Sequence, residues 1–262
     1  IGNVVLTLPA SLWFSRFNAR VLTSITVILG VVFVALQGWA PGFLILILGR
    51  VIFGVVMVAR DPARAILIRQ WFPNRELMLA NGILQGMIYL SDTLAFLLTP
   101  FILLLLNGSW RGTLYVYTLL YAVIAIMWIV GGKERNPSTG HKTTNQYVPV
   151  SISNVLKHKR LWYGSLFIFT ANILWSGQVT FWPTLMLDKF DIPLTISGLL
   201  QSLTWLVTSC GGIAVALIIT KRDIRKPLLL ISPTILIISA ICMTLTGSIP
   251  ALIMLSIIHG AS

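Results

Sequence analysis

The chain has 262 residues, of which 56% are hydrophobic and only 10% are charged, with a mean hydropathy of +0.90. Soluble domains carry roughly 25% charged residues, and disordered chains are poor in apolar ones, so both of these classes are excluded. The net charge of +12 would suit a nucleic-acid partner. The basic residues lie between long apolar runs, however, which instead predicts a protein embedded in the lipid bilayer with no nucleic-acid partner.

Nine apolar runs follow one another along the chain. We expect helices that cross the membrane, because about 20 apolar residues span the hydrocarbon and every backbone group must be paired within its segment. Strands of a membrane barrel are shorter and alternate in polarity, so the fold is predicted to be all-α. The end runs are short, which leads us to expect a chain cut inside membrane segments at both ends. The runs are 3–14 (partial), 21–39, 43–66, 79–106, 112–131, 161–186, 194–219, 227–246 and 250–262 (partial).

The basic residues are strongly asymmetric across these predicted spans. Of the 19 Lys and Arg residues, all except Arg50, Arg111 and Lys189 lie in loops on one side. Cytoplasmic loops are rich in Lys and Arg, so this side is predicted to be cytoplasmic. We therefore expect a multi-pass protein of the plasma (inner) membrane.

Residues 132–160 form the only long polar stretch and hold six basic residues. We interpret them as a cytoplasmic linker between an N-terminal bundle, 1–131, and a C-terminal bundle, 161–262. A short basic loop joins two spans in each part, and such an echo is typical of transporters built from two parallel repeats. The basic side chains of these loops are candidates for gating contacts: Arg16, Arg20, Arg222, Arg225 and Lys226.

Several motifs lie between the third apolar run and the fifth. The chain reads R-x-x-x-G-x-x-x-V-x-x-x-P over 50–62, then W-F-P-N-R-E over 71–76 and A-N-G over 80–82, with Trp-Arg at 110–111. These stretches resemble the fourth helix and the following loop of the major facilitator superfamily, with one glycine lost. They are most similar to its organic-anion and related uptake branches. The loop at 11–20 resembles the superfamily's loop pattern G-x-x-x-D-R-x-G-R-R in a degenerate form.

The resemblance implies twelve helices in two halves of six, joined by a cytoplasmic linker. On this alignment residue 1 lies in the second helix and residue 262 in the tenth, so about nine of the twelve helices are present. The chain would then be a two-bundle transporter fold truncated at both ends.

Two ionisable side chains lie inside predicted spans, where they are costly and so indicate function. Arg50 is in the 43–66 run, and its planar donor fork suits an anionic solute. Asp92 is near the middle of the 79–106 run and is a candidate proton carrier, since burial favours the protonated carboxyl group. A purely structural Arg50–Asp92 ion pair is the alternative.

Three predicted helices carry polar and aromatic side chains on one face, because these residues recur three or four positions apart. The resemblance implies that the three faces line a central cavity, and plain helix packing is the alternative for the tryptophans. The faces are Asn81, Gln85, Tyr89 and Asp92; Asn172, Trp175, Gln178 and Trp182; and Ser197, Gln201, Trp205 and Thr208.

The leading functional hypothesis is a secondary transporter that works by alternating access. Its preferred form is uptake of a small organic or inorganic anion coupled to protons or ions, that is, symport. Efflux of hydrophobic compounds is the alternative within transport, and a membrane-embedded sensor or enzyme is the alternative outside it. The chain has no H-E-x-x-H motif, Cys/His cluster or phosphate-binding glycine loop. We therefore expect no enzyme, no metal site and no cofactor.

Overall fold

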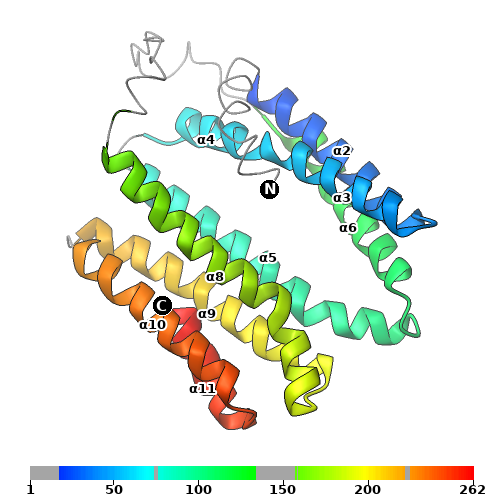
Figure 1. Cartoon of the computed structure of the whole chain (residues 1–262). Coiled ribbons are helices and arrows are strands. Elements are labelled where there is room, and N and C mark those ends of the chain that lie inside the picture. Colours follow the sequence, from blue (N-terminus) through cyan, green and yellow to red (C-terminus); the bar gives the residue numbers. More distant parts are fainter. Residues whose placement is uncertain (1–17, 74–75, 134–156, 158, 222–224) are drawn as a thin grey trace. The chain divides into compact units, whose positions relative to one another are not determined.

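The computed structural model describes residues 18–73, 76–133, 157, 159–221 and 225–262. Every regular element within these ranges is an α-helix, which confirms the predicted all-α membrane fold (Figure 1). The helices are α2 (Ala19–Trp39), α3 (Phe43–Val58), α4 (Arg60–Trp71), α5 (Leu77–Leu105), α6 (Trp110–Gly131), α8 (Lys159–Phe190), α9 (Leu194–Lys221), α10 (Arg225–Leu245) and α11 (Ile249–Ala261).

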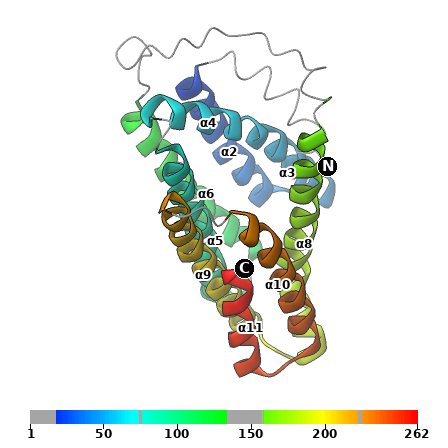
Figure 2. The same cartoon turned by 90° about the vertical axis from the view of Figure 1, so that its left-hand side faces the viewer.

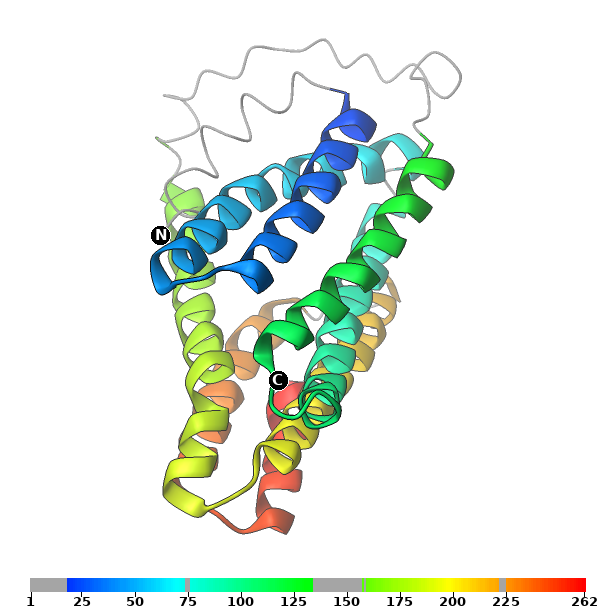
Figure 3. The ribbon, with the colours of Figure 1, turned by 90° about the vertical axis from the view of Figure 1, so that its right-hand side faces the viewer.

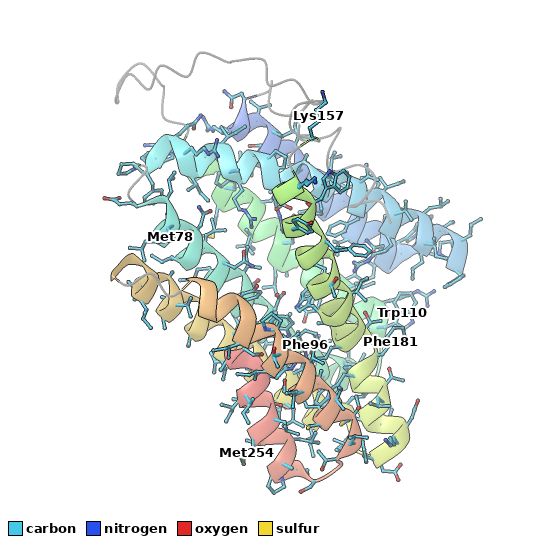
Figure 4. The ribbon with its side chains drawn as sticks, turned by 60° about the vertical axis from the view of Figure 1, so that its left-hand side comes forward. Met78, Phe96, Trp110, Lys157, Phe181 and Met254 are labelled. Atoms are coloured by element: carbon cyan, nitrogen blue, oxygen red, sulfur yellow. The ribbon has the colours of Figure 1, made fainter. Side chains whose placement is uncertain are left out.

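The lengths of the helices and their exposed apolar surfaces are typical of a protein surrounded by lipid. Within the described residues, five stretches are long and apolar enough to cross a membrane: α2, Phe43–Trp71, α5, α6 and Leu194–Ile218. Only 6% of the most apolar windows of α5 and α6 is buried. Side chains such as Phe181 and Met254 are 70% and 65% exposed, and both are labelled in Figure 4. Contiguous exposed apolar surface on this scale marks contact with lipid, so the protein is an integral multi-pass membrane protein.

The predicted span 43–66 differs from the structure, which breaks it at Ala59 and extends it to Trp71 as α3 and α4. Pro62 has no backbone N–H to donate to the Val58 carbonyl, so the regular helical ladder fails at this point. At the break, the Ala59 N–H donates to Val56 O, three residues earlier, at 3.3 Å. This turn is tighter than a turn of α-helix. The polar start of α4 carries a surface ion pair of Arg64 with Asp61, 3.5 Å apart.

The start of α2 is fixed by Asn18, which the hydropathy pattern does not mark. Its side-chain oxygen accepts hydrogen bonds from the backbone N–H groups of Arg20, at 3.0 Å, and Val21, at 3.3 Å. These donors have no partner inside the helix, so an N-cap asparagine stabilises the helix by about 1 kcal/mol. The helix therefore begins two residues before the predicted run.

The described helices fall into two compact units by their contacts. Unit 1 contains residues 1–81 and 101–140, and unit 2 contains residues 82–100 and 141–262. The middle of α5 thus groups with the C-terminal helices. The predicted bundles 1–131 and 161–262 and the linker 132–160 stay predictions, and residues 134–156 lie outside the described part of the chain.

Unit 1 is held together by close packing of α2 against α6 (Figure 3). Gly30 lies directly against the ring of Tyr121, because a Cβ at this position would be 2.6 Å from the ring carbon Cε1. Gly38 meets Tyr115 in the same way at 3.2 Å. Small residues let helices approach in a membrane, where packing rather than hydrophobicity drives association.

Unit 2 has a core of large apolar side chains between α8, α9, α10 and α11. Met186 and Leu252 are fully buried there, with Trp182 and Leu200 beside them. Near the end of α8, the Lys189 ammonium donates to Thr244 O at 2.9 Å, close to the C-terminus of α10. A cation at a helix C-terminus pairs the last carbonyls and complements the helix dipole.

The orientation of the helices gives a first testable prediction. A reporter fused within 132–160 should report a cytoplasmic location, and reporters at Gly108 or Lys189 should report the outside, because the basic residues are retained in the cytoplasm. Paired alkaline phosphatase and fluorescent protein fusions at the three sites measure this directly. An external 132–160 segment would overturn the predicted orientation.

Candidate functional site

The middle of α5 and the helix α9 approach each other closely within unit 2. Ser209 Oγ of α9 donates to the Gly86 carbonyl at 2.7 Å. At the other end of the contact, a Cβ on Gly198 would lie 2.7 Å from the Pro100 ring and 2.9 Å from Phe96 O. Pro100 cannot donate to the Phe96 carbonyl, so this oxygen is left facing the glycine. The two backbones are therefore in contact along several turns.

An aromatic cluster joins three helices of unit 2 at this contact. Trp205 of α9 stacks on Tyr89 of α5, with ring centroids 5.6 Å apart and an interplanar angle of 25°. Trp205 also meets Trp175 of α8 edge-on at 5.6 Å and 79°. Both geometries are favourable for aromatic pairs. Trp205 is 4% exposed and Trp175 is 45% exposed. The α9 side of the cluster is therefore buried, and the α8 side is accessible.

The cluster lies at mid-depth in the membrane. Trp205 is roughly 17 Å from the start of α9 at 1.5 Å per residue. Tyr89 is roughly 18 Å from the start of α5 by the same rise. The hydrocarbon core is about 30 Å thick, so these residues lie near its centre.

A stripe of buried polar atoms runs along α9 toward this cluster. Ser197 and Gln201 are 0% and 1% exposed, and with Trp205 they are spaced four residues apart on one face. Among the residues that the structure describes, Ser197 Oγ, Gln201 Oε1 and Trp205 Nε1 have no hydrogen-bond partner. Buried polar groups are normally paired. An unpaired stripe at mid-membrane therefore marks a candidate site for a polar solute.

Other residues that we expected to line a cavity in unit 2 lie on α8 and α5. Gln178 of α8 is partly buried, and its Nε2 lies 3.9 Å from Met243 Sδ of α10. Gln85 and Asp92 are partly buried on α5, one turn before and one turn after Tyr89. Trp182, expected on the cavity face of α8, is 3% exposed and packs in the apolar core of unit 2.

Arg50 is exposed on α3, with its guanidinium carbon 5.8 Å from the centroid of the Phe53 ring. Arg50 belongs to unit 1 and Asp92 to unit 2, so an interaction between them stays a prediction.

The predicted gating loops are described only in part. Arg20 is exposed in the first turn of α2. Arg16 and Arg222 lie outside the described residues. Arg225 and Lys226 begin α10, and their side chains also lie outside the described part. Within the described ranges, no group of three or more His, Cys, Asp or Glu side chains is placed to hold a metal ion.

The structure shows two contacts in unit 2 that are not part of the site predicted from the sequence. The α5–α9 contact has a sequence signal, because Gly82 and Gly86 form the G-x-x-x-G spacing typical of close helix pairs in membranes. The buried hydrogen bond between Ser239 and His259 has no such signal, since it joins two helices through residues 20 positions apart.

These features define an integral membrane protein of packed helices whose polar and aromatic side chains meet at mid-depth. A family model described as the Major Facilitator Superfamily matches residues 1–262, and the chain belongs to this superfamily of membrane transporters. It is also 23% identical over 244 residues to a protein named "Uncharacterized transporter YybO" from Bacillus subtilis (strain 168). That match covers 85% of this chain and 54% of the relative, so the chain spans about half the length of this curated relative.

Proposed function

We propose that the protein is a secondary active transporter of the plasma membrane that takes up a small organic or inorganic anion together with protons or other ions. Membership of the superfamily supports transport by alternating access. In this mechanism two bundles rock about a site near the bilayer midplane. The protein would act as a carrier rather than an enzyme.

The solute site of this proposal is the mid-depth face of α5, α8 and α9. The exposed part of Trp175 offers an apolar wall. The buried Gln201 oxygen and the Trp205 indole N–H offer an acceptor and a donor that lack protein partners in the described residues. A pocket with apolar walls and few polar groups is typical of small-molecule sites. Opening of this face between transport states would bring the polar stripe to the solute.

The preference for an anion rests on one observation, the exposed guanidinium of Arg50 inside an apolar helix. A charge at this depth is costly, so its retention favours a role in binding. Arg presents a rigid planar fork that pairs two oxygens of a carboxylate or phosphate, whereas Lys presents a single point charge.

Replacing Arg50 tests this role. Arg50→Lys keeps the charge but loses the two-point geometry, so anion uptake should fall about 10-fold or more, with normal protein abundance. Uptake of labelled benzoate, succinate and inorganic phosphate into proteoliposomes measures this. Arg69→Lys, on the exposed surface of α4, is the matched control and should transport normally.

Full anion uptake by Arg50→Ala would remove the anion site. It would leave efflux of hydrophobic compounds ahead, because the half-exposed Trp175 beside Trp205 also suits a flat apolar solute. Ethidium extrusion by the same proteoliposomes distinguishes the two functions.

A further inference from the structure

A second polar cluster lies on the other side of α9, between α9, α10 and α11, which run side by side (Figure 2). Ser239 Oγ of α10 lies 2.8 Å from His259 Nδ1 of α11. Both residues are buried, at 2% and 8% exposure. Ser239 is roughly 21 Å from the start of α10 at the helical rise, so the pair is well inside the membrane.

Ser239 Oγ has two hydrogen-bond partners within reach, the Leu236 carbonyl and His259 Nδ1. The Ser239 hydroxyl donates its single proton to the Leu236 carbonyl at 3.0 Å. In this arrangement the Ser239 oxygen accepts from a protonated Nδ1, whereas a hydroxyl that turns to the ring would donate to an unprotonated Nδ1. With Nδ1 protonated, the lone pair of the neutral imidazole is on Nε2.

The packing around His259 excludes bulk water. Gly260, the next residue, lies against the backbone of α9, because a Cβ there would be 2.4 Å from Thr204 O. Ser256, one turn before His259, is 0% exposed, and its hydroxyl has no hydrogen-bond partner in the described part of the chain. The Ser256 hydroxyl, on the same helix as His259, is thus free to form a further hydrogen bond.

The described parts of α9 and α10 bring no fixed charge to this cluster. The described side chains of α9 and α10, which pack against α11, include no Asp, Glu, Lys or Arg. Their titratable groups are the thiols of Cys210, which is exposed, and Cys242, which is partly buried. Asp188 and Lys189 lie at the end of α8, which shares an apolar core with Leu252 of α11. The basic residues at the cytoplasmic ends of α9 and α10 have side chains outside the described part: Lys221, Arg225 and Lys226.

We propose that His259 is a proton-binding site of the transporter, with Ser239 as its positioning residue. The inference rests on the proposed function and assigns its proton coupling to α11. Nε2 accepts one proton from water when the site opens, and the ring becomes an imidazolium that still donates from Nδ1 to Ser239 Oγ. The same proton leaves Nε2 to water on the other side. No other bond changes. Because no carboxylate among the described side chains of α9, α10 and α11 balances the added charge, each protonation state favours a different degree of water access.

A titration of the single imidazole tests the site directly. The chain has three histidines, so the variant His141→Gln/His158→Gln leaves only His259. The probe is ¹⁵N-labelled histidine in this variant, reconstituted in lipid bilayers and followed by NMR between pH 4 and 9. We expect the Nδ1–H tautomer at high pH and an imidazolium at low pH. A ring that stays neutral throughout, or an Nε2–H tautomer, would overturn the proposal.

The role of Ser239 gives a second readout. Ser239→Ala removes a hydrogen bond to the ring, so the NMR midpoint should shift by about 0.4–1 pH unit while the protein still folds. Cys242→Ala, three residues along α10, is the matched control and should leave the midpoint unchanged. An unchanged midpoint in Ser239→Ala would show that the serine does not position the titrating nitrogen.

Transport separates this inference from the proposed function. His259→Gln should retain exchange of labelled benzoate across proteoliposomes but lose the alkalinisation that accompanies net uptake. If uptake and alkalinisation persist together, His259 is not the coupling site and the proposed function stands. If none of the probe anions moves in the unmodified protein, the proposed function fails, and the NMR titration still decides whether His259 binds a proton.

Discussion

Trp205→Ala is expected to abolish solute transport and to lower the stability of unit 2. The substitution removes the ring that stacks on Tyr89 and meets Trp175 edge-on. Truncating a buried Trp costs about 3–5 kcal/mol in soluble cores, and we expect about 3 kcal/mol here, since lipid is as apolar as the side chain. The thermal unfolding midpoint of the purified protein and its uptake of labelled benzoate measure the two effects.

Trp205→Phe separates packing from solute binding at the same position. Phe keeps an aromatic ring against Tyr89 but removes the indole N–H, which has no partner in the described residues. Folding should therefore be retained. Loss of one hydrogen bond to the solute should weaken transport about 2- to 10-fold. Full transport by this variant would mean that Trp205 serves packing alone.

Gly198→Val is expected to prevent stable folding of the contact between α5 and α9. The added Cβ would lie 2.7 Å from the Pro100 ring and 2.9 Å from Phe96 O. A proline ring and a backbone carbonyl cannot move aside as a flexible side chain does. Overpacking typically costs about 1–3 kcal/mol, and two further methyl groups raise this strain. We expect a large fall in folded protein by size-exclusion chromatography of membrane extracts.

Gly211→Val on the same helix is the matched control. A Cβ at Gly211 meets no other atom within 4 Å, so the same change should leave protein abundance near normal. Equal losses in both variants would show that α9 tolerates valine poorly for a general reason. The close approach of α9 to α5 would then not be the cause.

The sequence predicted those features that depend on local periodicity. Four-residue spacing placed Ser197, Gln201 and Trp205 on one face of α9, and the structure buries all three there. Helical geometry alone brings such residues to one face, whereas the lining of a cavity by this face stays a prediction. The run 21–39 likewise matches α2 to within two residues, since Asn18 adds only the cap.

Features that depend on single backbone groups or on tertiary contacts could not be predicted in the same way. Hydropathy is smooth across Ala59, although Pro62 removes the hydrogen bond that would continue the helix. The sequence does not show which helix packs against Gly82 and Gly86, because the G-x-x-x-G spacing can accommodate any closely packed helix. The pairing of Arg50 with Asp92 joins two units and stays a prediction for the same reason.

Anion accumulation driven by a proton gradient is the most direct measurement of transport function. Proteoliposomes with an acidic exterior and no ATP should accumulate labelled benzoate, succinate or inorganic phosphate above equilibrium, and a protonophore should abolish this accumulation. Protein-free liposomes set the passive background. If none of the three anions enters faster than this background while ethidium is extruded, anion uptake is contradicted.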